Sequence, residues 1–138
     1  MKVYLSVPIV ANRNARRARL MARAIADSGH EVSSPWVLLP AGEEGPPSPD
    51  VFTRDKRGVE ASDAILADVS APSTGVGMEV MEAHMLGKRV MLAVAKGSTV
   101  SKMVMQLEPA EKLEFAGDQE LYDAIVKALS APRPSGLP

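Results

Sequence analysis

A glutamate in a glycine-containing turn is the first residue of this sequence that suggests chemistry. Glu79 closes the stretch Ser73-Thr74-Gly75-Val76-Gly77-Met78-Glu79, which follows an apolar segment and leads into a helical pattern. We expect Glu79 in the first turn of that helix, where the positive end of the helix dipole favours the ionised form that a nucleophile requires. Gly75 and Gly77 would let backbone amides approach a ligand closely. A glutamate at a helix start is also ordinary capping chemistry, so position alone leaves both interpretations open.

A second carboxylate is expected on the apolar side of another helix. Phe52, Asp55 and Val59 are spaced i, i+3 and i+7, so Asp55 shares the stripe that faces the core. A buried carboxylate is unfavourable unless it is paired or functional, and burial shifts carboxyl groups toward acid–base use. The neighbours Arg54 and Lys56 point elsewhere on the helix and need not neutralise it. A slightly rotated helix would instead place Asp55 at the solvent edge.

Tyr4 is the third candidate. It lies in the first apolar segment and is one of two tyrosines in the chain. Its hydroxyl is suited to hydrogen-bond a catalytic carboxylate. As a single observation, a tyrosine that fills the core with a satisfied hydroxyl is the commoner case.

Other kinds of site find little support in the sequence. The chain has no cysteine, and His30 and His84 have no spaced ligand partners, so we expect no metal and no cofactor. Residues 75–80 match only part of the dinucleotide-binding fingerprint, and there is no Gly-Lys-Ser/Thr phosphate loop. With a net charge of −1, no global field attracts nucleic acid or an anionic membrane, so the expected partner is a small molecule. Arg13, after the first apolar segment, is the arginine best placed to meet a phosphate.

Alternating strands and helices are expected to position these candidates. The apolar and β-branched runs predict strands over residues 2–7, 30–37, 64–69, 89–95 and 112–116. Helical spacing predicts helices around residues 18–25, 50–62 and 76–86, and a last one capped by Asp118. Asp50 is the expected cap of the second helix, and Gly29 ends the first. Residues 39–49 hold four prolines and two glycines, which predicts a loop that acts as a lid.

This alternation predicts right-handed βαβ units around a sheet covered on both faces. The expected fold class is α/β, a Rossmann-like (flavodoxin-like) three-layer sandwich with a five-stranded parallel sheet. We expect a single domain over residues 1–130 and a flexible tail over 131–138. The start resembles no signal peptide, and no apolar run approaches the roughly 20 residues of a membrane span, which predicts a cytoplasmic protein.

The three candidates together resemble the site of a known enzyme family. The arrangement is a tyrosine early in the first strand, an aspartate in the helix before the third strand, and Gly-x-Gly-x-Glu after that strand. It resembles the nucleoside 2-deoxyribosyltransferase family, and within it the 2'-deoxynucleoside 5'-phosphate N-hydrolases. The resemblance covers roughly residues 2–126 and is most specific over 61–79 and 87–90.

The resemblance implies a role for each candidate. Glu79 would be the nucleophile on the anomeric carbon of the sugar, Asp55 the acid/base partner, and Tyr4 the residue that orients and tunes Glu79. The implied reaction is hydrolysis of the N-glycosidic bond of a (deoxy)nucleoside 5'-monophosphate. It would release the free base and a sugar 5-phosphate through a glycosyl-enzyme on Glu79.

The resemblance also implies substrate-binding residues. Ser73 and the turn at Gly75 and Gly77 resemble the cradle for the 5'-phosphate. Ser101 resembles a serine that the neighbouring subunit contributes, which implies a homodimer with shared active sites. The other expected substrate-binding residues are Pro8, Ile9 and Arg13 in the first loop, Trp36, and Met103 near Ser101. Trp36 is placed to stack on a base, but a role in the core or in a dimer contact is an equally good interpretation.

Three alternatives remain at this point. In base exchange, a second nucleobase would replace water in the second step. A non-catalytic nucleotide-binding module with the same fold is a second alternative, because fold does not determine function. The third is a phosphoribohydrolase, but residues 73–77 lack that family's double glycine followed by threonine. The first loop, residues 7–13, departs from the resembled family, because it lacks the glycines and the serine of the hydrolases' Gly-Ser-Ile-Arg-Gly-Gly type of sequence.

Overall fold

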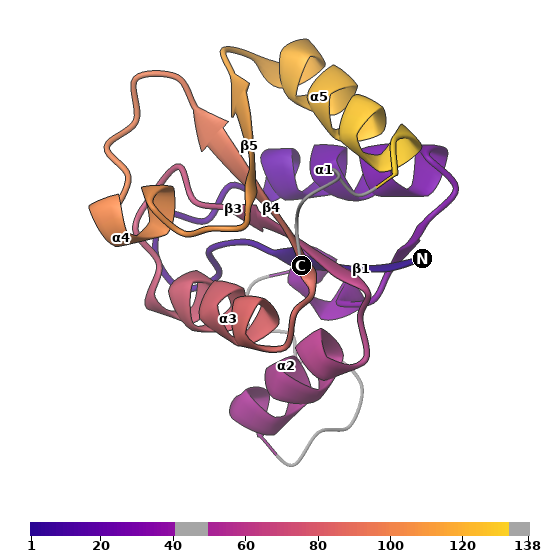
Figure 1. The fold of residues 1–138 in the computed structure, drawn as a ribbon, viewed down its shortest axis with the longest axis vertical. Helices are drawn as coiled ribbons and strands as arrows, with labels where there is room; N and C mark the ends of the chain where they lie inside the picture. Colours follow the sequence, from indigo (N-terminus) through magenta and orange to yellow (C-terminus); the bar gives the residue numbers. More distant parts are fainter. Residues whose placement is uncertain (41–49, 133–138) are drawn as a thin grey trace.

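A five-stranded parallel sheet forms the centre of the protein (Figure 1). The structure is a computed structural model and describes residues 1–40 and 50–132. The strands lie in the order β2-β1-β3-β4-β5, the flavodoxin-like order, which confirms the predicted fold class. They are β1 (Lys2–Ser6), β2 (Glu31–Val32), β3 (Ala64–Asp68), β4 (Arg89–Ala95) and β5 (Glu111–Phe115).

Two pairs of helices cover the two faces of the sheet (Figure 1). They are α1 (Ala15–Asp27) with α5 (Asp118–Ser130), and α2 (Val51–Glu60) with α3 (Thr74–Met85). Successive strand residues point to opposite faces, so Val3 and Leu5 pack toward α1, whereas Tyr4 packs in the core beneath α3. The alternation within β1 therefore decides that Tyr4 faces the helix that carries Glu79.

Side chains cap the starts of α1, α2 and α3, and one of these caps, Asp50, was predicted from the sequence. The Asp50 carboxylate accepts a hydrogen bond from the backbone N–H of Thr53 at 2.6 Å and begins α2. Ser73 accepts one from the backbone N–H of Val76 at 3.3 Å, so α3 begins at Thr74, earlier than predicted. Gly117, not Asp118, is the N-cap residue of α5.

The second predicted strand, over residues 30–37, is wrong for most of its length. Only Glu31 and Val32 pair with β1, and a 3-10 helix, η1 (Pro35–Leu38), follows. A proline has no N–H to donate to a strand ladder. The buried hydroxyl of Ser34 instead accepts a hydrogen bond from the backbone N–H of Leu5 at 2.9 Å and donates to its carbonyl at 2.8 Å. One side chain thus satisfies the groups that a longer strand would have paired.

Three further segments complete the comparison with the predicted elements. A short helix, α4 (Lys102–Met105), was not predicted, and β5 begins one residue earlier than expected. The predicted lid over 39–49 and the predicted tail over 131–138 fall outside the described residues from positions 41 and 133, respectively. Within the described part of the chain, none of the helices combines the length and the apolar composition needed to cross a membrane.

Candidate active site

A cleft lies at the carboxyl edge of the sheet, where β1 and β3 are neighbours and the strand order reverses. The chain leaves β1 toward α1 on one face and leaves β3 toward α3 on the other, which opens the kind of crevice where such sheets bind ligands. The cleft has a volume of about 710 Å³. Its lining includes residues 7, 9–11 and 72–76, together with Arg54, Asp55 and Glu79. Two of the three predicted catalytic residues, Asp55 and Glu79, therefore line one cleft.

Glu79 is held by two hydroxyl groups of β1. The Tyr4 hydroxyl donates a hydrogen bond to Oε2 of Glu79, and the Ser6 hydroxyl donates one to Oε1 at 3.0 Å. Tyr4 is only 1 % exposed and lies in the same core cluster as Val80 and Val76 of α3. Since both donors project from one rigid strand, the orientation of the carboxylate is determined by the sheet.

The environment of Glu79 makes its carboxyl group a weaker acid than that of an ordinary glutamate. Burial raises the pKa of Glu79 from 4.5 to about 7, although the hydrogen bonds from Tyr4 and Ser6 lower it. The expectation that the helix dipole favours the ionised form is wrong, because α3 begins at Thr74 and Glu79 lies beyond its first turn. Burial and the neighbouring Glu79 carboxylate both raise the pKa of Tyr4, which keeps it a neutral donor.

Asp55 forms an ion pair with its neighbour in the chain. Nε of Arg54 lies 2.9 Å from Oδ1 of Asp55, and the two side chains are 17 % and 25 % exposed. The expectation that Arg54 points away from Asp55 is therefore wrong. The Cζ atom of the guanidinium also lies over the ring of Trp36, 4.9 Å from its centroid, which is a cation–π contact.

Trp36 packs against the ring of Tyr4. Its ring meets that of Tyr4 edge-on, with 6.1 Å between centroids and 63° between planes. Arg54 lies over the ring, so a base would stack on that face only if the arginine moved. The predicted stacking of a base on Trp36 stays a prediction, and the described contacts make the ring a support for Tyr4 and Arg54.

Gly58, in the middle of α2, leaves room for this packing. A Cβ atom at position 58 would lie 2.7 Å from Cε2 of Tyr4 and 3.1 Å from Cη2 of Trp36. Glycine inside a helix is unfavourable by about 1 kcal/mol relative to alanine. The close approach of two rings explains why this helix carries one.

Gly58→Ala is expected to lower kcat roughly 3–10-fold with little change in KM, because it pushes the Tyr4 ring away from Glu79. Overpacking by about 1–3 kcal/mol is partly offset by the better helix propensity of alanine. Kinetics and the fluorescence of Trp36, the only tryptophan, would follow the change. Arg57→Ala, an exposed change on the same helix, is the control. Unaltered kcat and fluorescence in Gly58→Ala would contradict this prediction.

The predicted phosphate-binding residues lie around the start of α3. Ser73, Thr74 and Ser101 share a second cavity of about 520 Å³, which also includes Gly77. Ser101 is exposed, begins α4 and lies beside Ser73 of its own chain. Gly75 lines the catalytic cleft, and a Cβ at either glycine would meet open space. The structure thus brings Ser73, Gly75, Gly77 and Ser101 together.

The first loop contributes less than predicted. Ile9 is exposed and lines the cleft, whereas Pro8 is buried. The Arg13 guanidinium donates to the carbonyl of Leu39, so it is bound to the segment after η1. Asn12 adopts a positive φ of 60° and donates from Nδ2 to the carbonyl of Pro72 at 2.9 Å. This bond ties the loop after β1 to the loop after β3.

Met103 is 68 % exposed and lies on α4, away from Glu79 and beside Met78.

Ser6, Arg54 and Gly58 were not among the candidates predicted from the sequence. Ser6 is two residues after Tyr4 and therefore shares its face of the sheet, a signal that strand periodicity carries. Gly58 interrupts a helical pattern, which is a second usable signal. Arg54 has no local signal, because its partner Trp36 belongs to another element. Among the described residues, no group of three histidine, aspartate or glutamate side chains is arranged to hold a metal ion.

Comparison with known proteins places the chain among relatives with a shared name. No family model matches the sequence. It is 34 % identical over 110 residues to "Putative 2'-deoxynucleoside 5'-phosphate N-hydrolase 1" of Methanococcoides burtonii, a match that covers 76 % of this chain and 89 % of that one. This chain belongs to the 2'-deoxynucleoside 5'-phosphate N-hydrolase family. The protein of the same name from Thermofilum pendens is 36 % identical over 93 residues, 65 % of each chain.

Solved structures share the fold of this N-hydrolase family member. A CMP N-glycosidase of Clostridium botulinum superimposes with a TM-score of 0.66 at 17 % identity and covers 89 % of this chain and 96 % of its own. A conserved protein from Enterococcus faecalis gives 0.61 at 13 % identity, over 93 % and 98 %. At such identities the likeness concerns the fold. The resemblance inferred from Tyr4, Asp55 and Glu79, and the N-glycosidase class of enzyme with it, is confirmed by the family.

Proposed function

We propose that this protein hydrolyses the N-glycosidic bond of (deoxy)nucleoside 5'-monophosphates and passes through a glycosyl-enzyme on Glu79. The observation that carries the proposal is the carboxylate of Glu79, bound by Tyr4 and Ser6 and sharing one cleft with Asp55. The names of its relatives, N-hydrolases of 2'-deoxynucleoside 5'-phosphates, support it, as does a CMP N-glycosidase with the same fold.

The arrangement suits a two-step, retaining reaction. An oxygen of Glu79 bonds to C1' of the sugar while the bond from C1' to the base nitrogen breaks, and its electron pair leaves with the base. Asp55 assists the departure of the base. In the second step a water oxygen bonds to C1', the bond from C1' to Glu79 breaks, and Asp55 accepts the proton that the water loses. The products are the sugar 5-phosphate and the free Glu79 carboxylate. Each carboxylate oxygen offers two lone-pair positions, so the hydrogen bonds from Tyr4 and Ser6 leave one position on each oxygen for the attack.

Incubation with a panel of nucleoside 5'-monophosphates, scored for released base, tests the proposal. Release of base from at least one nucleotide, and slower release from the matching free nucleoside, is the expected result, because Ser73 and its cavity are expected to bind the phosphate. Addition of a second free base distinguishes the alternative of base exchange, since a transferase would form a new nucleotide. Nucleotide binding without turnover over a long incubation would instead favour the non-catalytic module.

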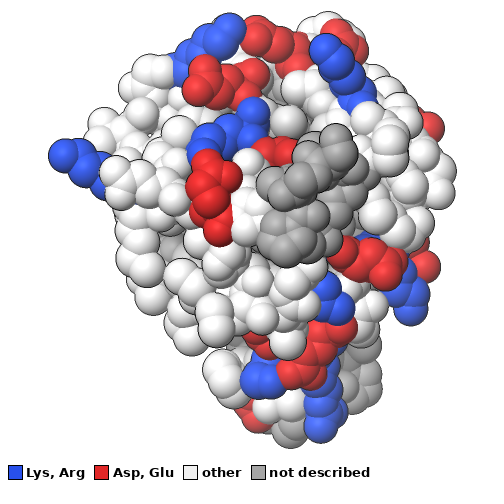
Figure 2. Space-filling view, viewed as in Figure 1, with Lys and Arg blue, Asp and Glu red and all other residues white. Residues whose placement is uncertain are grey.

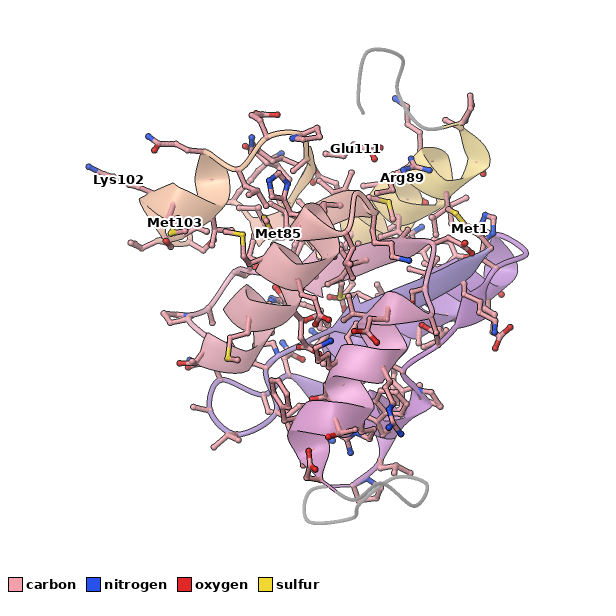
Figure 3. The ribbon with its side chains drawn as sticks, turned by 60° about the horizontal axis from the view of Figure 1, so that its bottom comes forward. Met1, Met85, Arg89, Lys102, Met103 and Glu111 are labelled. Atoms are coloured by element: carbon pink, nitrogen blue, oxygen red, sulfur yellow. The ribbon has the colours of Figure 1, made fainter. Side chains whose placement is uncertain are left out.

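We also propose that the protein works as a homodimer with shared sites. The face over α3 and α4 carries few charged side chains (Figure 2). Met85 of α3 is 75 % exposed and Met103 of α4 is 68 % exposed; both are labelled in Figure 3. A hollow of about 590 Å³ between these helices is lined by Met78 and Met103. Adaptable apolar side chains of this kind are common on surfaces that pack against a partner.

Mixing two variants is the direct test of sharing. Ser101→Ala alone is expected to weaken nucleotide affinity while light scattering still shows a dimer. Mixed with Glu79→Gln chains, it should regain turnover at low nucleotide concentration, because only a hybrid dimer holds one site with both wild-type residues. If Ser101 serves its own chain, mixing restores nothing. Met85→Glu is expected to give monomers, and a fully active monomer would end the proposal.

A further inference from the structure

Arg54 is held more rigidly than an arginine near a protein surface usually is. Its guanidinium plane lies over Trp36, 4.9 Å from the ring centroid, and its Nε is bound to Asp55 at 2.9 Å. Only 17 % of the side chain is exposed. Ordering an arginine side chain in this way costs conformational entropy, and the contacts of the ordered group must offset that cost.

Part of its donor capacity is unused. An arginine carries five N–H donors, four of them on the two Nη atoms. Across residues 1–40 and 50–132, neither Nη atom of Arg54 makes a hydrogen bond. Because the residue lines the same cleft as Glu79, these donors are available to a ligand in that cleft.

We propose that Arg54 binds the base of the nucleotide, an inference that rests on the proposed function. Its free Nη–H groups donate hydrogen bonds to the acceptor of the base beside the glycosidic nitrogen, O2 of a pyrimidine or N3 of a purine. As the bond to C1' breaks, its electron pair moves onto that base nitrogen while a Glu79 oxygen bonds to C1'. The guanidinium then stabilises the negative charge on the departing base until the base takes up a proton that the Asp55 carboxylate accepts from water.

The charge beside Arg54 favours a base over the 5'-phosphate as its ligand. The carboxylate of Asp55, 2.9 Å from Nε, would repel a doubly charged phosphate, whereas a base is neutral when it binds. Hydroxyl groups of Ser73 and Thr74 line the cleft at the start of α3 and, with Ser101, the adjoining cavity, where a phosphate is better placed. Arg54 is therefore assigned to the base end of the cleft.

Substitution at position 54 tests the assignment. Arg54→Gln is expected to lower kcat/KM roughly 10–100-fold, the loss typical of a hydrogen bond to a charged group. Arg54→Lys keeps the positive charge without the planar guanidinium, so its kcat/KM should lie between those of the wild type and Arg54→Gln. Arg57→Gln, an exposed change on the same helix, should stay within about twofold. An effect of Arg54→Gln no larger than that of Arg57→Gln would overturn the proposal.

Two further measurements separate base binding from a structural role. Wild-type protein should discriminate against a 3-deazapurine nucleotide, which lacks the N3 acceptor, and Arg54→Gln should abolish that discrimination. In a double-mutant cycle, Arg54→Gln should still lower the rate of Asp55→Asn. A variant that keeps the discrimination, or loses nothing in the Asp55→Asn background, would show that Arg54 acts only by positioning Asp55.

Binding of free bases distinguishes failure of this inference from failure of the proposed function. Trp36 lies under Arg54 and is the only tryptophan, so its fluorescence reports on ligands at the guanidinium. Titration of wild-type protein with adenine and cytosine should change this fluorescence, and Arg54→Gln should weaken the binding about tenfold. Should no nucleotide be hydrolysed, this result would still support the base site. Equal binding by both proteins would overturn it.

Discussion

Glu79→Gln is expected to abolish turnover, with a loss in kcat of roughly 10³–10⁶-fold. The glutamine side chain has the same shape, and its one amide oxygen can still accept a hydrogen bond from Tyr4 or from Ser6, but its amide cannot form the bond to C1'. Glu82→Gln, one turn further along α3, is the matched control, since Glu82 lies near Lys56 at 3.9 Å rather than at Tyr4. Steady-state kinetics on the best nucleotide of the panel would measure both. Activity of Glu79→Gln within tenfold of the parent would contradict a role as nucleophile.

The same substitution should stabilise the protein, and more so at higher pH. The pKa of Glu79 is about 7 in the folded protein against 4.5 for an ordinary glutamate, so folding favours its protonated form. This contribution is present below about pH 4.5 and is lost as pH rises through about 7, where the folded protein must hold a buried carboxylate. Thermal unfolding at about pH 5 and pH 8 should therefore show a gain for Glu79→Gln that grows by about 1–3 kcal/mol. A gain that is equal at both pH values would contradict the raised pKa.

Tyr4→Phe is expected to lower kcat/KM at pH 7 roughly 10–100-fold, by removal of the donor to Oε2 of Glu79. Since the hydrogen bond from Tyr4 lowers the pKa of Glu79, its loss raises that pKa further above about 7. The nucleophile must be ionised, so the acidic limb of the pH–rate profile should move to higher pH, and part of the loss should be recovered at about pH 9.

Tyr122→Phe provides the control for this experiment. Tyr122 is the other tyrosine; it lies on α5 and donates to Asp27 at 2.5 Å, outside the cleft. Its replacement should leave the profile unchanged. If the acidic limb of Tyr4→Phe does not move while the rate falls, Tyr4 only orients Glu79 and does not tune its acidity.

Much of the framework follows from short-range patterns in the sequence. The apolar run within Lys2–Ser6 predicts a strand, and the helical spacing around residues 18–25 places apolar side chains on one face of a helix, so these elements of the fold could be predicted. The cap Asp50 binds a backbone group only three residues away, so the start of α2 could be predicted as well, whereas the cap Ser73 and the earlier start of α3 were not predicted. Because the carboxyl ends of parallel strands meet at one edge, the placement of Glu79 near that edge follows too.

The contacts that give these residues their properties depend on partners far apart in the chain. Nothing near Glu79 in the sequence shows that burial and two hydroxyls of β1 hold its pKa at about 7. Arg54 pairs with Asp55 and also lies over Trp36, and η1, which carries Trp36, replaced a predicted strand. Hydrophobic periodicity and capping are local and appear in the sequence, whereas burial, charge pairing and the close approach at Gly58 arise only when separate elements pack together.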